Sequence, residues 1–403
     1  KGLPPTVVTG RFALEGSGGG LAKGRAGLDL QVTAGEVGGV AVHGAVLRAG
    51  FDSGLARLDT LFVATAAGRV EAGGTLGLVA DRTGSLRVQV SADSLVALRP
   101  LLFPDTVSEG GAGGRVGGAF ELWATLSGTR SDLNVDVEAL LDAVAYDRIA
   151  TGKAGLRLTA RGLGTGRMHL EASVEADSLR FYGVNLNRAR VATTVDGRAG
   201  ELSIEALGPR GQEYWLASGF GSDGKAAELE LRELRLGEGP TGWTLVGPAR
   251  ARAEGGAITL SALELTRGDG SGRIHAEGKL PWDLHIGGAA SGPEPPGSFR
   301  LTLDRVPIGE LLQLVGPEPE LDGVLDGSLE VLGEAYAPAM NAEVAVSGLR
   351  YRDARLDRLD ARVSYVGRLL DGRFEARQGD RRVLAGRGRI PVDLALAPLP
   401  ERR

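Results

Sequence analysis

Two stretches of this chain repeat a seven-residue pattern without a gap. They are residues 278–284 (GKLPWDL) and residues 388–394 (GRIPVDL), which lie 110 positions apart. Each copy closes a run in which apolar and polar residues alternate. A chain that repeats the closing segment of a run of strands is built as an array. The repeat therefore predicts a long β-sheet of similar units, not one compact domain around one active site.

The strands themselves are predicted from strict alternation, which places apolar side chains on one face and polar side chains on the other. Leu170 and Val174, for example, alternate with His169, Glu171 and Glu175. The chain has 64 glycines in 403 residues, roughly twice the usual share of ~7%, which is typical of many short strands joined by turns. Spacing of ~11 residues per strand and turn predicts on the order of 35 strands of about eight residues.

Further internal matches divide the predicted sheet into larger units. Residues 179–189 align with 349–359, and a third copy begins near Tyr146. Short amphipathic helices are predicted over 304–315 and, less regularly because of a proline, over 93–103. The matches and helices predict four segments of the chain. These are β-repeats over 1–92, a short helix with β-repeats over 93–287, a Pro/Gly linker over 288–298, and a truncated unit of helix and β-repeats over 299–403.

Composition argues against several function classes. A net charge of −5 disfavours nucleic acid as the main partner, since phosphate neutralisation needs a basic surface. The chain has no cysteine and only four scattered histidines, at 43, 169, 275 and 285, so we expect no metal site, and we expect these histidines to lie on solvent faces. No phosphate-binding loop or nucleophile motif is present. We therefore expect no catalytic residues, no cofactor and no enzyme. A membrane anchor is expected outside this chain, because no run of 18 apolar residues occurs.

The distinctive feature is the aliphatic face of the predicted strands. Only 5% of residues are aromatic, and strands continue well beyond the seven to nine that close an ordinary sandwich. One solution is an all-β, elongated and curved repeat sheet that leaves a hydrophobic groove for acyl chains, with one or two short helices. The predicted groove residues are Leu170, Val174, Leu229, Leu231, Leu329, Val331, Val344 and Val346. The alternative for each of them is core packing between two sheets.

The closing motif G-x-[LI]-P-x-D-L, the helix followed by residues 322–338 (DGVLDGSLEVLGEAYAP), and the Gly-rich, cysteine-free composition resemble the TamB group of AsmA-like bacterial envelope proteins. The resemblance is best over 299–403. It implies a periplasmic β-taco, a folded-over sheet enclosing an apolar groove, in a protein anchored in the inner membrane of a Gram-negative bacterium. It also implies transport of phospholipid to the outer membrane and an outer-membrane β-barrel partner of the assembly family.

Three alternatives remain open. The same scaffold could act as a chaperone in outer-membrane protein assembly or autotransporter secretion, pairing an exposed strand edge with unfolded barrel strands. A secreted β-solenoid or adhesin with a packed interior predicts a regular repeat of ~20–30 residues, whereas the offsets here are long and uneven. A transmembrane barrel would need aromatic girdles, which nine Phe, six Tyr and four Trp do not support.

Overall fold

The computed structural model describes residues 6–18, 24–79, 82–98, 116–181, 184–237, 239–281, 296–313, 321–352 and 354–396. These residues are nearly all in β-strands, as predicted, and they form 25 strands with few helical turns. The chain divides into two compact units, residues 1–197 and 198–403. Each unit is described by itself.

Unit 1 is a sheet in which each strand pairs antiparallel with the strand before it. The short β9 continues the line of β10, since both pair with β8 and β11. The 3-10 helix η1 (Leu95–Leu98) precedes β7. The strands are β1 (Thr6–Ser17), β2 (Arg25–Val37), β3 (Val40–Asp52), β4 (Leu55–Thr65), β5 (Gly68–Gly77), β6 (Gly84–Ala92), β7 (Val116–Thr129), β8 (Asp132–Tyr146), β9 (Ile149–Ala150), β10 (Lys153–Leu163), β11 (His169–Phe181) and β12 (Val184–Asp196).

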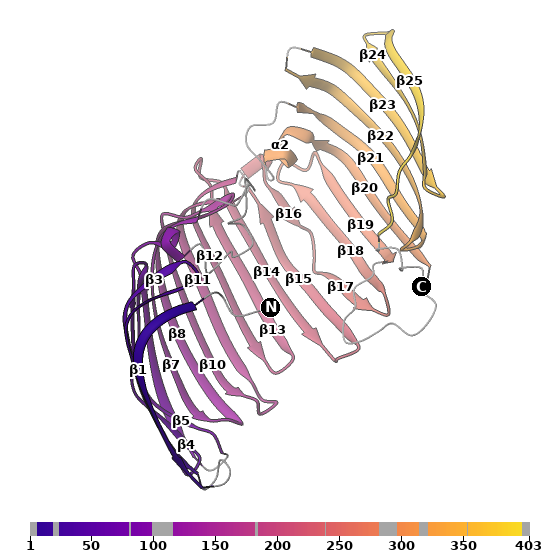
Figure 1. The fold of residues 1–403 in the computed structure, drawn as a ribbon. Coiled ribbons are helices and arrows are strands. Elements are labelled where there is room, and N and C mark those ends of the chain that lie inside the picture. The colour runs from indigo at the N-terminus through magenta and orange to yellow at the C-terminus, as the bar shows by residue number, and fades with distance from the viewer. Residues whose placement is uncertain are drawn as a thin grey trace. The chain divides into compact units, whose positions relative to one another are not determined.

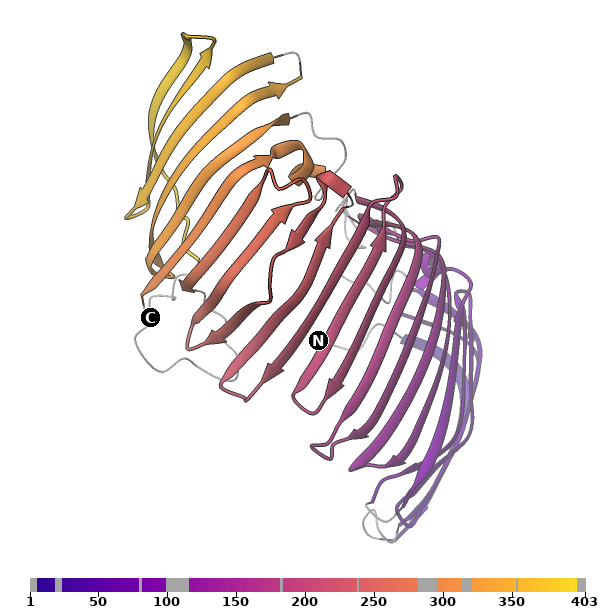
Figure 2. The ribbon, with the colours of Figure 1, turned by 180° about the vertical axis from the view of Figure 1, so that it is seen from behind.

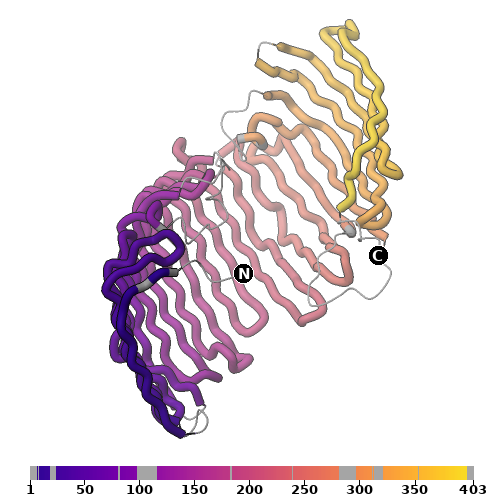
Figure 3. Tube along the Cα trace, in the orientation of Figure 1, coloured from indigo at the N-terminus to yellow at the C-terminus, as the bar shows by residue number. Residues whose placement is uncertain are grey.

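Unit 2 repeats this arrangement, and β16 and β17 both lie between β15 and β18. Figures 1 and 3 show its strands side by side and bent along their length. The elements are β13 (Ala199–Leu207), β14 (Glu213–Ser222), β15 (Ala226–Leu236), η3 (Gly239–Thr241), β16 (Trp243–Leu245), β17 (Ala249–Glu254), β18 (Ala257–Arg267), β19 (Arg273–Pro281), β20 (Gly297–Pro307), α2 (Ile308–Gln313), β21 (Leu321–Glu334), β22 (Ala337–Tyr351), β23 (Ala354–Val366), β24 (Leu369–Gln378) and β25 (Arg381–Pro391).

The strands are longer and fewer than the sequence predicts. Most full strands have 9 to 15 residues, and the described residues form 25 strands where about 35 were expected. One cause is that glycines predicted to mark turns lie inside strands. Asp371 and Gly372 form an Asp-Gly pair, a dipeptide common in hairpin turns, yet both are paired within β24, and the turn before that strand is formed by Gly367 and Arg368.

The predicted helices are also shorter than expected. Residues 304–307 complete β20, and the helix begins at Ile308 and is described to Gln313, because the strand pairing of Pro307 with Val324 extends to the start of the helix. Residues 314 and 315 lie outside the described residues. Over 93–103 the structure has only the 3-10 helix at Leu95–Leu98, and residues 99–103 lie outside the described residues. Most of the predicted linker 288–298 also lies outside them, although Gly297 and Ser298 belong to β20.

The internal matches at 146, 179 and 349 correspond to equivalent strand ends. In each copy an aromatic residue, Tyr146, Phe181 or Tyr351, is the last residue of a strand and is about half exposed. A residue with positive φ lies three positions earlier in each copy, at Ala143, Ser178 and Gly348. The repeat therefore encodes a local backbone kink as well as a strand.

The two glycines that open the repeated seven-residue pattern have different backbone requirements. Gly278 in β19 has φ 114°, and a Cβ atom there would overlap the carbonyl oxygen of Ser298. Gly388 in β25 has no heavy atom within 4 Å of the same position. We expect Gly278→Ala to lower the free energy of unfolding by about 1–3 kcal/mol. Gly388→Ala, the matched control, should be neutral or raise it slightly. Urea unfolding of both variants checks this, and equal losses would contradict it.

Candidate functional site

In unit 2, strand register places aliphatic residues on one face of every strand. Residues directly opposite each other on antiparallel strands project to the same face. One row across six strands is Leu303, Gly327, Val344, Ala361, Phe374 and Gly386, and a second is Val306, Leu325, Val346, Leu359, Ala376 and Leu384. We call this the apolar face of unit 2. Leu229 of β15 lies on the same face, because register links it through β17, β18 and β19 to Phe299 of β20. Leu231, two residues further along β15, projects to the same side.

Unit 1 has an equivalent apolar face. A single row crosses ten strands with only aliphatic residues, namely Val32, Ala45, Val63, Val70, Val90, Leu122, Ala139, Leu156, Val174 and Val191. Leu170 lies on the same face, opposite Ala160 and Val195. The sequence therefore places all eight predicted groove residues on the apolar face of their own unit.

These faces are only partly covered. Of the eight residues, Val331 and Val346 are buried, at 4% and 5% exposure, whereas Leu229 is 45% and Val174 is 37% exposed. Leu170, Leu231, Leu329 and Val344 are intermediate. Side chains between two packed sheets would be buried throughout. Exposed aliphatic side chains along a continuous face are thus the main chemical feature of each unit.

The opposite face of each sheet is polar. Glu230 of β15 accepts hydrogen bonds from Arg250 and Arg232, and these bonds lower its pKa. His169 and His275 lie on polar faces and His43 is exposed, as predicted, while His285 lies outside the described residues. Hydrogen bonds to Asp196 and Glu171 raise the pKa of His169. The charged side chains of these exposed ion pairs favour contact of the polar face with water. Each pair contributes little to the free energy of unfolding.

One end of the apolar face of unit 2 has a small core. Trp243, Leu265 and Val306 are buried together, with partly buried leucines around them. Helix α2, the orange coiled ribbon in Figure 2, contacts β20 and β21, and β20 contributes Val306 to this cluster. Helix α2 therefore lies next to this end of the apolar face.

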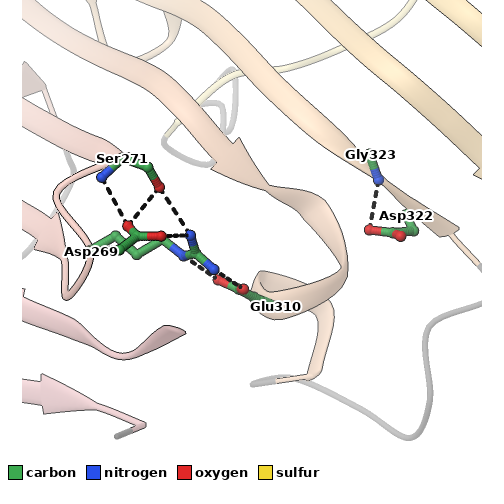
Figure 4. A network of polar contacts seen from close by, with 6 residues as sticks. Asp269, Ser271, Glu310, Asp322 and Gly323 are labelled. Carbon is green, nitrogen blue, oxygen red and sulfur yellow. Dashed lines mark hydrogen bonds and ion pairs between the residues drawn. The ribbon is translucent and has the colours of Figure 1, made fainter. Parts of the chain in front are cut away.

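An ion pair attaches α2 to the sheet. Arg267 lies opposite Trp243, and its Nη2 and Nε atoms donate to Glu310 at 2.7 and 3.2 Å. Its Nη1 also donates to Asp269 and Ser271, as the network in Figure 4 shows. The bond to Glu310 raises the pKa of the guanidinium. With side chains 15% and 25% exposed, this pair is shielded better than the ion pairs of the polar face.

We expect Glu310→Gln to lower the free energy of unfolding by about 1–3 kcal/mol, because a charge-assisted, part-buried pair is replaced while Arg267 stays charged. Glu277→Gln, which alters an exposed pair with His275, should change it by less than about 0.5 kcal/mol. Urea unfolding measures both. If the two variants lose the same stability, Arg267 and Glu310 do not secure α2.

At the other end of this face, the chain after β25 crosses the sheet. The Leu394 N–H donates to the Tyr365 hydroxyl at 3.0 Å, and the Leu396 N–H donates to the carbonyl of Ala335. Tyr365 is 2% exposed and belongs to the apolar face, opposite Met340 and Leu370. Residues 394 and 396 therefore contact this end of the face, while Val344 in its middle is partly exposed.

Among the described residues, no cluster of three or more His, Asp or Glu is suited to hold a metal ion. No helix within them is long and apolar enough to span a membrane. Comparison with known proteins finds no matching family model, curated protein or solved structure.

Proposed function

We propose that this chain is a non-enzymatic lipid conduit, in which acyl chains lie along the apolar faces while the polar faces contact water. The supporting observation is the row of aliphatic residues across ten strands of unit 1, with Val174 37% exposed on it. A conventional core would leave no such side chain open.

In this proposal the free energy of lipid binding is a sum over buried methylene groups, and binding does not require a specific pocket. Transfer of an acyl chain from water gains about 0.8 kcal/mol per buried methylene. Because neighbouring rows of the face have the same aliphatic character, a chain shifted by one strand keeps most of this energy. A lipid tail can then move along the face without crossing a large barrier.

The resemblance to the TamB group supports a proposal for where the protein acts in the cell and with which partner. We infer a periplasmic segment of an inner-membrane protein that moves phospholipid between the inner and outer membranes, with an outer-membrane β-barrel as partner. The motifs at 278–284 and 388–394 support this assignment.

Photocrosslinking tests lipid contact directly. Benzoylphenylalanine would be placed at Val344 and Leu170 on the apolar faces, with Glu343 and Glu171 as matched controls one residue away on the polar faces. After irradiation in cells, mass spectrometry should find phospholipid adducts at Val344 and Leu170 and none at the controls. An absence of lipid adducts at both apolar positions would refute the proposal.

A second candidate function is strand addition. Among the described strands, β25 pairs only with β24, so one of its sides could accept a strand from an unfolded barrel protein. However, β25 has arginines at four of its eleven positions, and charge on an edge strand opposes such pairing. Crosslinks from β25 to nascent outer-membrane proteins, without lipid adducts elsewhere, would favour this candidate.

A further inference from the structure

The last three strands of unit 2 have a charge opposite to that of the whole chain. Residues 351–391 contain eleven arginines, no lysine and six acidic residues, although the chain as a whole has a net charge of −5. The excess positive charge is therefore concentrated in β23, β24 and β25.

Register brings much of this charge together on one face. Arg362 of β23 lies directly opposite Arg373 of β24, which lies directly opposite Arg387 of β25. Arg377 and Arg382 also face each other. All five are exposed. We call the polar face of β23–β25 the arginine face.

The carboxylates on this face do not neutralise it. Arg362 pairs with Glu343 at 3.1 Å, and Asp371 is shared by Arg387 and Arg389 at 3.2 and 3.0 Å. Arg377 pairs with Glu375 and Arg358 pairs with Asp360, each at 2.8 Å, but the arginines of this face still outnumber its carboxylates. Arg373 has no carboxylate partner among the described residues. Like charges directly opposite each other destabilise a sheet, so an anionic ligand would relieve this arrangement.

We propose that the arginine face docks on the surface of an anionic phospholipid bilayer. Guanidinium groups bind phosphate oxygens in a fork geometry, and basic residues near an anionic membrane each strengthen its binding. The arginines of this docking site lie on the face opposite the apolar face, although the edge strand β25 contributes residues to both. Binding of these arginines to phosphate does not depend on whether acyl chains lie on the apolar face.

Two features favour a bilayer over nucleic acid. The edge strand β25 is amphipathic, since Arg382, Arg387 and Arg389 face one side while Leu384 and Ile390, each 57% exposed, face the other. A cationic side beside exposed aliphatic residues is typical of elements that lie at a membrane interface. The described residues of the arginine face include no aromatic side chain on which a base could stack.

The test is co-sedimentation of the full chain with phosphatidylcholine vesicles, with and without phosphatidylglycerol. We expect binding only when phosphatidylglycerol is present, and weaker binding at higher salt. A variant with Arg362→Gln, Arg373→Gln and Arg387→Gln should bind on the order of 100-fold more weakly. The matched control changes Arg48, Arg157 and Arg190, ion-paired arginines of unit 1, to Gln, and should bind like wild type.

Two further measurements check that a change in vesicle binding reflects the charge of the arginine face and not loss of the fold. Glu375→Gln removes an acidic residue from the arginine face and should tighten vesicle binding about 5-fold. The triple variant should unfold at a temperature no lower than wild type, because it removes like-charge contacts. Equal binding to vesicles without phosphatidylglycerol, equal losses in the two triple variants, or binding to single-stranded DNA but not to vesicles would overturn the proposal. None of these results bears on lipid adducts at Val344.

Discussion

Replacing Trp243 with alanine is expected to lower the free energy of unfolding of unit 2 by about 3–5 kcal/mol. Trp243 is only 3% exposed and packs with Leu265 and Val306 in the buried hydrophobic cluster found in the described part of this unit. Its loss leaves a cavity that thin, single-layer packing cannot refill. The same change should weaken the packing of helix α2 against β20, which carries Val306.

Urea unfolding and hydrogen exchange measure this effect. Exchange should accelerate in β16, β18 and β20, the strands that contribute the cluster. The control is Trp215→Ala on the polar face of β14, where Arg235 lies over the Trp215 ring at 5.9 Å from its centroid. Loss of this cation–π contact should lower the free energy of unfolding by about 0.5–1 kcal/mol, in addition to the effect of the lost packing. Equal losses for the two tryptophans would show that unit 2 has no localised core.

Placing a carboxylate at Val344 is expected to weaken phospholipid binding on the order of 100-fold. Val344 lies in the middle of the apolar face, opposite Gly327 and Ala361, and a charge among acyl chains costs about 2.5–3.5 kcal/mol. Partial exposure of Val344 lets the folded protein keep the aspartate hydrated when no lipid is bound. Val344→Asp should therefore fold and fail to hold lipid.

Binding of a fluorescent phospholipid to purified protein measures this prediction. The control is Asn341→Asp, which adds the same charge to the same strand on the polar face, opposite Glu330 and Ser364. It should bind lipid like wild type. Wild-type affinity in Val344→Asp would mean that acyl chains do not contact this part of the sheet.

The two faces could be predicted from the sequence because alternation alone fixes them. A one-residue shift in register would move every side chain of a strand to the other face, so a strand such as Leu170–Val174 has one acceptable pairing with its neighbours. All eight groove residues accordingly lie on the apolar faces. Whether those faces hold lipid is a separate question, which alternation does not answer.

Strand number and the polar networks could not be predicted in this way. Glycine marks turns at some positions and lies within a strand at others, as at Gly278 and Gly372, and only strand pairing distinguishes the two. Arg267 and Glu310 are 43 residues apart in the sequence. The arginines of the arginine face come together only through the pairing register of three strands. Such contacts follow from the tertiary arrangement and have no local sequence signal.

The absence of native cysteine permits a direct test of the central claim that the apolar faces are open to lipid. A nitroxide would be attached to Leu329→Cys on the apolar face and, separately, to Ser328→Cys on the polar face. Phospholipid with a nitroxide in its acyl chain would then be added and dipolar broadening measured by electron paramagnetic resonance. We predict strong broadening for the label at 329 and none for the label at 328. No broadening at 329, or equal broadening at both positions, would contradict the account.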